Sequence, residues 1–266
     1  MQDVHELLIM LLDLVESSSI QFKPHRSMGL RCLLEEVEEA KQMHSAIFPP
    51  NLTFSQSCPF VGMFASMLVC NSCHTQSPIQ LTSFTLLSLA FPEGCTDGRI
   101  DVMEMVEYFQ RPEHLDNVTC QNCGVERSVN MTKLLRIAQF PPVFCLHLLR
   151  VQYDNFQVRK IHTKVDFPLV LTLQVDDFLP NVLPTSAPQP QPLHFALSSV
   201  ITHEGGPHSG HYITYRAVEY YGRRRWFRIS DEFVSMVSTD HVLGVNPYLL
   251  FYERLETSCA PLHSSL

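Results

Sequence analysis

The stretch Gly210-His-Tyr-Ile-Thr-Tyr-Arg216, followed by Trp226-Phe-Arg-Ile-Ser230-Asp231, decides the fold of this 266-residue chain. Both segments are enriched in β-branched and aromatic residues, which favour strands. The span between them, residues 216–225, is typical of a hairpin, so the two strands are expected to be neighbours in a sheet. Pairing of this kind would bring the polar residues at the start of the first segment close to those at the end of the second.

Further strands are expected on both sides of this pair. Including the pair itself, the predicted strands cover residues 61–70, 79–91, 129–138, 143–150, 163–175, 193–202, 211–219, 225–230 and 247–254. Helices are expected over residues 4–15, 30–44 and 99–110. The fold class is therefore α+β, mostly antiparallel sheet with helices concentrated at the N-terminal end.

The first helix lacks Gly and Pro and is rich in Leu and Met, which predicts a largely buried helix. Asp3 is a candidate N-cap, with Glu6 completing a pattern like a capping box. Between the predicted elements, residues 49–59 are typical of a loop and the proline-dense residues 183–192 of an exposed connector. Residues 256–266 are expected to form a frayed tail.

The overall composition narrows the class of protein. A hydrophobic content of 45% and a charged content of 17% are typical of a folded globular chain rather than a disordered one. The net charge of −8 argues against nonspecific nucleic-acid binding, which needs a basic face, and would suit a basic protein partner. No apolar run has the length of a membrane span, and the first residues show no signal-peptide pattern.

Two Cys-x-x-Cys pairs predict a metal site. Cys70 and Cys73 form the first pair, Cys120 and Cys123 the second, and each pair can present two thiolates from one tight turn. Four thiolates around one ion give a closed tetrahedral zinc site, which is structural rather than catalytic. Free thiols in a site that has lost its metal are the alternative, and a redox role is disfavoured because two matched pairs would be a coincidence.

His211 is the candidate general base of the chain. Imidazole titrates near neutral pH, and either Ser230 or Asp231 at the end of the neighbouring strand could hold the ring in the productive tautomer. A single histidine on a strand is more often a structural residue. Here, however, His203 and His208 lie in the same glycine-containing stretch, which favours a functional site. These two histidines have weaker claims, since they could shape the loop or simply be solvated.

These motifs together resemble the ubiquitin-specific proteases, a family of papain-like cysteine peptidases. The resemblance runs nearly from end to end of the chain, in the family's order. Besides the two cysteine pairs, it rests on Gln2-Asp-Val-His-Glu-Leu7, Phe140-Pro-Pro-Val-Phe-Cys-Leu-His-Leu-Leu-Arg150, Gly210-His-Tyr212, Trp226-x-x-x-Ser230-Asp-x-x-Val234 and Asn246-Pro-Tyr-Leu-Leu-Phe-Tyr252.

The resemblance implies the papain-like ubiquitin-specific protease fold, with fingers, palm and part of the thumb. Residues 1–255 would form a partial catalytic domain, followed by the tail 256–266. Within that domain, residues 1–59 would be a remnant of the thumb, residues 60–138 the zinc-bearing fingers region and residues 139–255 the palm. The implied cofactor is one structural zinc ion, held by Cys70, Cys73, Cys120 and Cys123, with no organic cofactor.

The implied activity is deubiquitination, the thiol-dependent hydrolysis of the isopeptide bond after the C-terminal Gly-Gly of ubiquitin. His211 would be the base and Ser230 its orienting partner, with Asp231 hypothesised to supply negative charge. Asp3 and Tyr212 match positions that contact the ubiquitin tail, although N-capping and core packing are the simpler roles for these two residues. Ubiquitin and ubiquitinated proteins are the implied partners.

The family's nucleophile lies in a Gly-Asn-Thr-Cys-Tyr box that precedes the segment matched by residues 2–7, and this sequence contains no such box. The cysteines outside the two pairs lack the motif: Cys32, Cys58, Cys95, Cys145 and Cys259. We therefore expect a chain truncated at its N-terminus, with the nucleophile box outside it, inactive by itself and poorly soluble when expressed alone.

Finer features resemble the member of the family found in the mitochondrial outer membrane. They are Cys58-Pro-Phe60, His74-Thr-Gln-Ser-Pro78, Leu87-Ser-Leu89 and Ser230. This implies an intracellular protein on the cytosolic side, with the mitochondrial outer membrane as a candidate location. Two alternatives to an active enzyme are a catalytically inactive ubiquitin-binding or scaffolding protein and a zinc-ribbon interaction module. The second leaves the C-terminal motifs unexplained.

Overall fold

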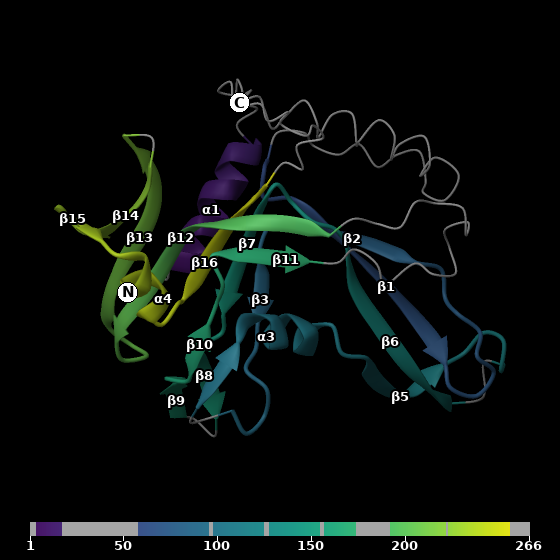
Figure 1. Ribbon diagram of the computed structural model, residues 1–266. Coiled ribbons are helices and arrows are strands. Elements are labelled where there is room, and N and C mark those ends of the chain that lie inside the picture. The colour runs from purple at the N-terminus through teal and green to yellow at the C-terminus, as the bar shows by residue number, and fades with distance from the viewer. Residues whose placement is uncertain are drawn as a thin grey trace, which may run out of the picture.

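The computed structural model describes residues 4–17, 58–95, 98–124, 128–154, 157–173, 192–221 and 223–255. The described part of the chain begins with helix α1 (Val4–Ser17), and strands dominate the rest of the described residues (Figure 1). Asp3, residues 30–44, most of the expected loop 49–59, residues 183–191 and the tail 256–266 lie outside the described residues. None of the described helices has the length and apolar character needed to cross a membrane.

An eight-stranded sheet forms the centre of the molecule. Its strands lie in the order β15 (Phe233–Val237), β14 (Arg223–Ser230), β13 (Gly210–Tyr220), β12 (Leu193–Gly205), β16 (Leu249–Arg254), β7 (Val143–Leu148) and β3 (Leu87–Leu89), and β11 (Val170–Leu173) also pairs with β12. Neighbouring strands are antiparallel except β3 and β7, which are parallel. The hairpin expected from the sequence is β13–β14.

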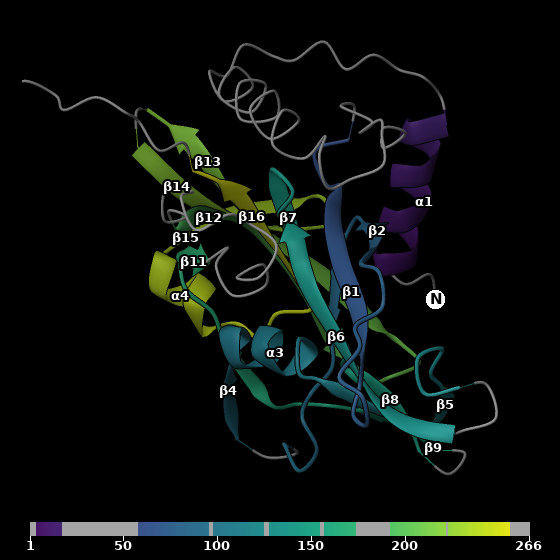
Figure 2. The same ribbon diagram turned by 90° about the vertical axis from the view of Figure 1, so that its right-hand side faces the viewer.

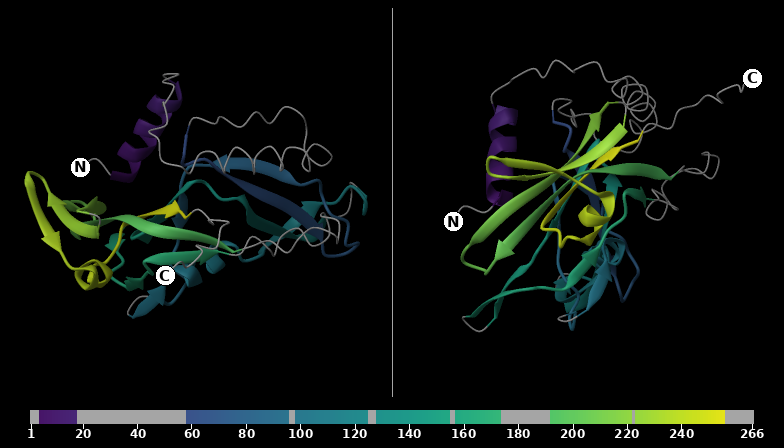
Figure 3. Two further views of the ribbon diagram at one scale, coloured as in Figure 1. Left: turned by 45° about the horizontal axis from the view of Figure 1, so that its top comes forward. Right: turned by 60° about the vertical axis from the view of Figure 1, so that its left-hand side comes forward.

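A four-stranded antiparallel sheet extends away from this centre (Figures 1 and 3). It contains β2 (Gln80–Phe84), β1 (Gly62–Cys70), β6 (Ser128–Gln139) and β5 (Glu113–Thr119), in that order. Strands β1 and β6 pair along almost their whole length, from Met63↔Gln139 to Cys70↔Met131. Both cysteine pairs therefore lie at the end of this sheet that is farther from Gln139. The first pair begins at Cys70, the last residue of β1, and the second lies between β5 and β6.

Short elements complete the fold. Strands β4 (Arg99–Asp101) and β10 (Lys164–Asp166) pair in parallel, and β8 (Val151–Asp154) and β9 (Gln157–Lys160) form a hairpin. Helix α3 (Val102–Phe109) begins at its N-cap Asp101, whose carboxylate accepts a hydrogen bond from the Met103 amide at 2.7 Å. Helix α4 (Thr239–Gly244) begins in the same way at Ser238, which accepts from the His241 amide.

The core lies on both faces of the eight-stranded sheet. On one face the main cluster includes fully buried Phe144, Leu250 and Tyr252 and the buried side of α3. On the other face Cys145, Tyr248 and Leu249 pack against Val4 and Leu8 of α1, so α1 and α3 lie on opposite sides of the sheet (Figure 2). Each fully buried large apolar side chain stabilises the fold by roughly 1.5–3 kcal/mol.

Some expected elements need correction. The segment 79–91 holds two strands, because the chain passes from β2 in the smaller sheet to β3 in the larger one. The segment 163–175 is likewise divided into β10 and β11. The helix expected at 99–110 begins only at Val102, since residues 99–101 pair as β4. Helix α1 buries one face only, leaving Leu7, Met10 and Leu11 44–65% exposed among the described residues, so the expectation of a largely buried helix is wrong there.

Candidate active site and metal centre

His211 and Ser230 meet across the β13–β14 hairpin. His211 is the second residue of β13 and Ser230 the last residue of β14, and the register Thr214↔Ile229 brings these two strand ends together. The distance from His211 Nε2 to Ser230 Oγ is 2.7 Å, which is a short hydrogen bond. The structure therefore brings together two of the side chains that the sequence indicated as catalytic.

The contact constrains the proton positions on the ring. If Nε2–H donates to the Ser230 hydroxyl oxygen, the remaining nitrogen, Nδ1, carries the lone pair and can accept a proton. We assign this tautomer from the hydrogen bond, since the hydroxyl can rotate to accept. The His211 side chain is 44% exposed, so a reacting group has access to it.

Asp231 follows directly in the turn between β14 and β15. Its Oδ2 lies 3.8 Å from His211 Nε2, and the carboxylate is 79% exposed. The backbone of Asp231 is left-handed, with φ of 51°, a conformation that Asp and Asn adopt more readily than other non-glycine residues. The turn therefore places the carboxylate beside the ring, at ion-pair distance and in contact with solvent.

The segment that leads into His211 is a tight turn closed by two glycines, with Gly205 opposite Gly210 and Glu204 opposite His211. Gly205 has φ of 105°, a conformation that favours glycine. A Cβ atom on Gly210 would lie 2.1 Å from the carbonyl oxygen of Glu204 and 2.2 Å from Nε2 of His203. Glycine is thus required next to His211 because the opposite strand approaches too closely for any side chain.

Tyr212 points to a cluster of rings rather than to His211. Its ring stacks on His203 at 4.6 Å between centroids, and Tyr248 lies 5.6 Å from it. Tyr248 also contacts His147, on which His5 of α1 stacks at 4.1 Å. The weaker candidate His203 is therefore a packing residue of this ring cluster, while His208 is exposed in the turn.

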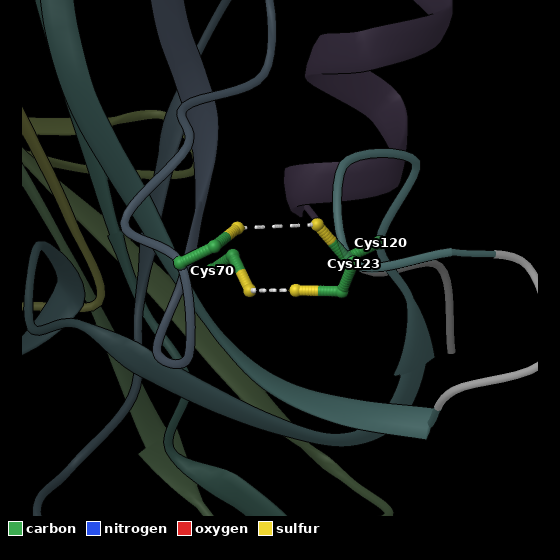
Figure 4. A group of neighbouring side chains, drawn as sticks. Cys70, Cys120 and Cys123 are labelled. Carbon is green, nitrogen blue, oxygen red and sulfur yellow. Dashed lines mark hydrogen bonds between the residues drawn. The ribbon is translucent and has the colours of Figure 1, made fainter.

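The two cysteine pairs come together at one point (Figure 4). The sulfur atoms of Cys70 and Cys123 are 3.8 Å apart and those of Cys73 and Cys120 are 3.6 Å apart, and all four lie within 4.8 Å of one another. A tetrahedral zinc ion with Zn–S bonds of about 2.3 Å has S···S edges of about 3.8 Å. The residues therefore fit a four-thiolate zinc site.

Electrostatics at this cluster favour a cation. A hydrogen bond with the Thr75 hydroxyl lowers the pKa of Cys73 to about 5, and the neighbouring Cys73 sulfur raises the pKa of Cys123 to about 12. The Cys73 thiolate thus forms readily, while the hydrogen bond to it keeps the proton on Cys123, a proton that metal binding would release. His74 lies just outside the cluster, exposed, with its amide donating to the Cys70 carbonyl.

The other described cysteines have different settings. Cys145 is completely buried in β7, and this burial raises the pKa of its thiol. Cys58 is buried and Cys95 half-buried, and among the described residues neither is hydrogen-bonded to His211. Cys32 and Cys259 lie outside the described residues, as does Asp3.

Sequence reasoning missed one charged contact at the site. Lys160, the last residue of β9, donates hydrogen bonds to the main-chain carbonyls of His203 and Gly205. These contacts join residues 43 and 45 positions apart in the chain, so no local motif could have indicated them.

A family model and the curated relatives of this chain point to the same protein family. The family model described as ubiquitin carboxyl-terminal hydrolase matches residues 1–252. Among curated relatives, ubiquitin carboxyl-terminal hydrolase 30 of Xenopus tropicalis is 26% identical over 97% of this chain and 64% of its own length. The protein of the same name from Homo sapiens is 27% identical over 74% of this chain and 54% of its own length. The chain thus spans less than two thirds of these relatives.

Solved structures with the same fold include two of the SAGA deubiquitinase module. The Ubp8/Sgf11/Sus1/Sgf73 DUB module bound to ubiquitin aldehyde has a TM-score of 0.64 at 24% identity, covering 85% of this chain and 49% of that chain. A yeast SAGA DUB module has a TM-score of 0.69 at 24% identity, covering 96% of this chain and 51% of that chain. At this level of identity the similarity concerns the fold.

Proposed function

The chain belongs to the ubiquitin carboxyl-terminal hydrolase family, and on that premise we propose that it contributes the base and the metal-bearing part of a thiol-dependent deubiquitinase. The reaction is hydrolysis of the isopeptide bond after the C-terminal Gly-Gly of ubiquitin. The observation that carries the proposal is the 2.7 Å hydrogen bond between His211 Nε2 and Ser230 Oγ, which leaves Nδ1 of an accessible imidazole as the proton acceptor.

In the proposed reaction His211 acts twice. Nδ1 first takes the proton of a cysteine thiol, and the thiolate attacks the carbonyl carbon of the isopeptide bond. The same nitrogen then gives that proton to the leaving lysine amine, which leaves an acyl-enzyme that water hydrolyses. Ser230 keeps the ring oriented by accepting the Nε2 hydrogen bond in both protonation states.

Ser230 is a neutral partner, so it stabilises the imidazolium less than a carboxylate would. Asp231 supports a division of roles, because its carboxylate lies 3.8 Å from the same ring nitrogen and supplies charge. We expect Asp231→Asn in an active full-length enzyme to lower turnover about two- to tenfold, because Asn keeps the left-handed turn and removes only the charge. Unchanged turnover and an unchanged pH–rate profile would contradict this role.

The proposal extends to substrate binding. Asp3 and Tyr212 are proposed to contact the C-terminal tail of ubiquitin, in which a carboxylate suits an arginine. The packing of Tyr212 on His203 and Tyr248 supports a fixed ring at the start of β13, next to the base. The net charge of −8 suits the basic face of ubiquitin. A ubiquitin partner is also supported by the related Ubp8-containing DUB module, whose structure was solved bound to ubiquitin aldehyde.

We propose zinc for the cysteine cluster. Cys70, Cys73, Cys120 and Cys123 would hold the ion and so fix the far end of the four-stranded sheet. A closed set of four ligands leaves no open position for substrate, so the ion's contribution is to folding. In the family's terms, this sheet corresponds to the fingers expected within residues 60–138 and the larger sheet to the palm.

The finer family resemblance supports a proposed location. The resemblance is to the member of the family found in the mitochondrial outer membrane, and relatives named ubiquitin carboxyl-terminal hydrolase 30 are among those that the chain matches. We propose on this basis that the full-length protein acts on the cytosolic side of the mitochondrial outer membrane. Imaging of the tagged full-length protein in fixed cells, or its detection in cell fractions, tests the location. A cytosolic pattern would contradict the proposal.

A second candidate is an inactive ubiquitin-binding protein. It is favoured by the absence of a Gly-Asn-Thr-Cys box in the sequence and by the lack of a cysteine hydrogen-bonded to His211 among the described residues. Under our proposal residues 1–266 by themselves bind ubiquitin without cleaving it. The retained pairing of His211 with Ser230 favours the enzyme, because a binding protein has no need of an oriented imidazole.

One experiment separates the two candidates. The full-length gene product and the 266-residue chain are compared for hydrolysis of ubiquitin with a fluorogenic amide at its C-terminus and for ubiquitin binding by calorimetry. We expect both proteins to bind ubiquitin and only the full-length one to hydrolyse the amide. Binding without hydrolysis by either protein would favour the inactive candidate, and absence of binding by both would overturn the proposed function.

A further inference from the structure

One side chain of the β8–β9 hairpin, that of Lys160, reaches the turn that precedes His211. The Nζ atom of Lys160 donates to the carbonyl oxygen of Gly205 at 2.6 Å and to that of His203 at 2.9 Å. Hydrogen bonds from a charged donor are shorter and stronger than those between neutral groups. A single ammonium group therefore binds two main-chain acceptors on either side of Glu204.

The two acceptor carbonyls lie next to the candidate base His211. Glu204 pairs with His211, and Gly205 pairs with Gly210, so the two carbonyls belong to the strand end that faces the candidate base. Neither glycine has a side chain to pack, and Gly205 adopts a left-handed backbone. The turn is thus held by main-chain contacts and by Lys160 rather than by side-chain packing of its glycines.

The groups around Lys160 act on its charge in opposite directions. Partial burial and the nearby Arg150 lower the pKa of Lys160, whereas Glu204 raises it. Both acceptors are main-chain carbonyls, so the ammonium is used to fix backbone. Glu204 is an exposed residue of the same strand end, and its charge favours the ammonium form.

We propose that Lys160 is a positioning residue of the active site, whose ammonium fixes the turn between Gly205 and Gly210 and thereby the placement of the His211 ring. The proposal rests on the proposed function, because the placement affects turnover only if His211 is the base. A misplacement of about 1 Å in a reacting group can lower a rate about a hundredfold, so a contact of this kind is sufficient to control turnover.

A second lysine provides a matched control. Lys164 of β10 also donates to main-chain carbonyls, to Gly244 at 2.8 Å and Leu243 at 3.5 Å, and burial likewise lowers its pKa. Its acceptors lie at the C-terminal end of α4, whereas those of Lys160 lie in the turn before His211. Lys160→Met and Lys164→Met therefore remove the same chemistry from two different places.

The test uses the full-length gene product with Lys160→Met, Lys160→Arg and Lys164→Met. Hydrolysis of the fluorogenic ubiquitin amide gives kcat and KM, and amide hydrogen exchange of the segment 203–211 reports the turn directly. We expect Lys160→Met to lower kcat about ten- to hundredfold with KM nearly unchanged, and to speed exchange in that segment. Lys160→Arg, which keeps a cationic donor, should recover most of both, and Lys164→Met should leave both unchanged.

Each remaining outcome decides the proposal. Wild-type kcat and exchange in Lys160→Met would overturn it, and equal losses of kcat in both Met variants would show a general loss of stability instead. If Lys160→Met fails to fold, Lys160→Gln, which is shorter and uncharged, replaces it with the same expected direction. If the wild-type protein hydrolyses nothing, the proposed function fails, while the exchange contrast between the two lysines still decides whether Lys160 holds the turn.

Discussion

The cysteine end of the four-stranded sheet and the His211 end of the larger sheet differ in how completely their chemistry is enclosed. Four sulfurs from two turns converge within 4.8 Å, with Cys70 and Cys120 almost fully buried. At the other end, two side chains from neighbouring strands meet at 2.7 Å and the imidazole stays 44% exposed. The first arrangement is closed, whereas in the second the imidazole is open to solvent.

The two regions should therefore respond differently to substitution. A closed four-thiolate site contributes to folding and has no position for substrate, so its loss should act on stability. An open, oriented base contributes to a reaction, so its loss should act on rate and leave the fold unchanged. Substitutions in the two regions should therefore separate an effect on stability from an effect on rate.

The largest effect is expected from Cys120→Ser. Losing one of four ligands should release the metal and destabilise the chain by several kcal/mol, because metal binding is coupled to folding. Zinc content measured by elemental analysis should fall from about one per chain to near zero, and the thermal transition should move down sharply. Full zinc content or an unchanged transition temperature would show that the cluster does not hold a structural ion.

His211→Gln should show the opposite pattern. Loss of the general base should lower ubiquitin-amide hydrolysis by the full-length gene product about 10²–10⁴-fold. Zinc content and unfolding temperature should stay at wild-type values, since the ring is partly exposed and lies in a different sheet from the cysteines. A drop in zinc content would contradict the independence of the two regions.

Most residues of the cysteine region and of the His211 region can be predicted from the sequence, because both regions are built from local motifs. The spacing within each Cys-x-x-Cys pair and the polar ends of the β13–β14 hairpin indicate the site residues from the sequence alone. Long strands such as β6 and β12, rich in residues that favour sheets, were expected at nearly their observed bounds.

The elements that escaped prediction are short or depend on distant partners. Strand β4 has three residues and exists because it pairs with β10, a partner more than 60 residues away in the chain. Strand β5 is mostly exposed and polar, and β15 lies at a sheet edge with Phe233, Val234 and Met236 exposed, so neither has an alternating buried pattern. Lys160 acts across 45 residues, where sequence alone gives no indication of a contact.

Gly210→Ala should have an intermediate effect that is confined to the open region. The new Cβ would come within 2.2 Å of atoms on the opposite strand, so the strands must separate beside His211. We expect a loss of about 1–3 kcal/mol in the free energy of unfolding and slower hydrolysis, with zinc content unchanged. Gly206→Ala is the control, because its Cβ would have no neighbour within 4 Å, and an equal effect of both variants would contradict the steric explanation.

The smallest effect concerns a surface ion pair outside both regions. Arg99 donates two hydrogen bonds to Asp166, at 2.6 and 2.8 Å, and joins β4 to β10. This contact lowers the pKa of the Asp166 carboxyl, so its stabilisation is present above the pKa of an unfolded aspartate and is lost as pH falls through the lower folded value. Because both groups are exposed to solvent, we expect this ion pair to contribute little to the free energy of unfolding.

Chemical denaturation of the wild type and Asp166→Asn at neutral pH and near pH 3 would measure this contribution. The difference in unfolding free energy between the two proteins should be present at neutral pH and shrink in acid. A difference that grows in acid would contradict the assigned sign.

The most direct test of the proposed chemistry is labelling of the full-length gene product by ubiquitin whose C-terminus carries a thiol-reactive group. We expect one covalent ubiquitin per chain, attached to a cysteine other than Cys70, Cys73, Cys120 and Cys123, and we expect His211→Gln to slow the labelling strongly at neutral pH. No labelling of a zinc-loaded, ubiquitin-binding protein, or labelling that is indifferent to His211, would contradict the claim that this chain supplies the base of a thiol-dependent deubiquitinase.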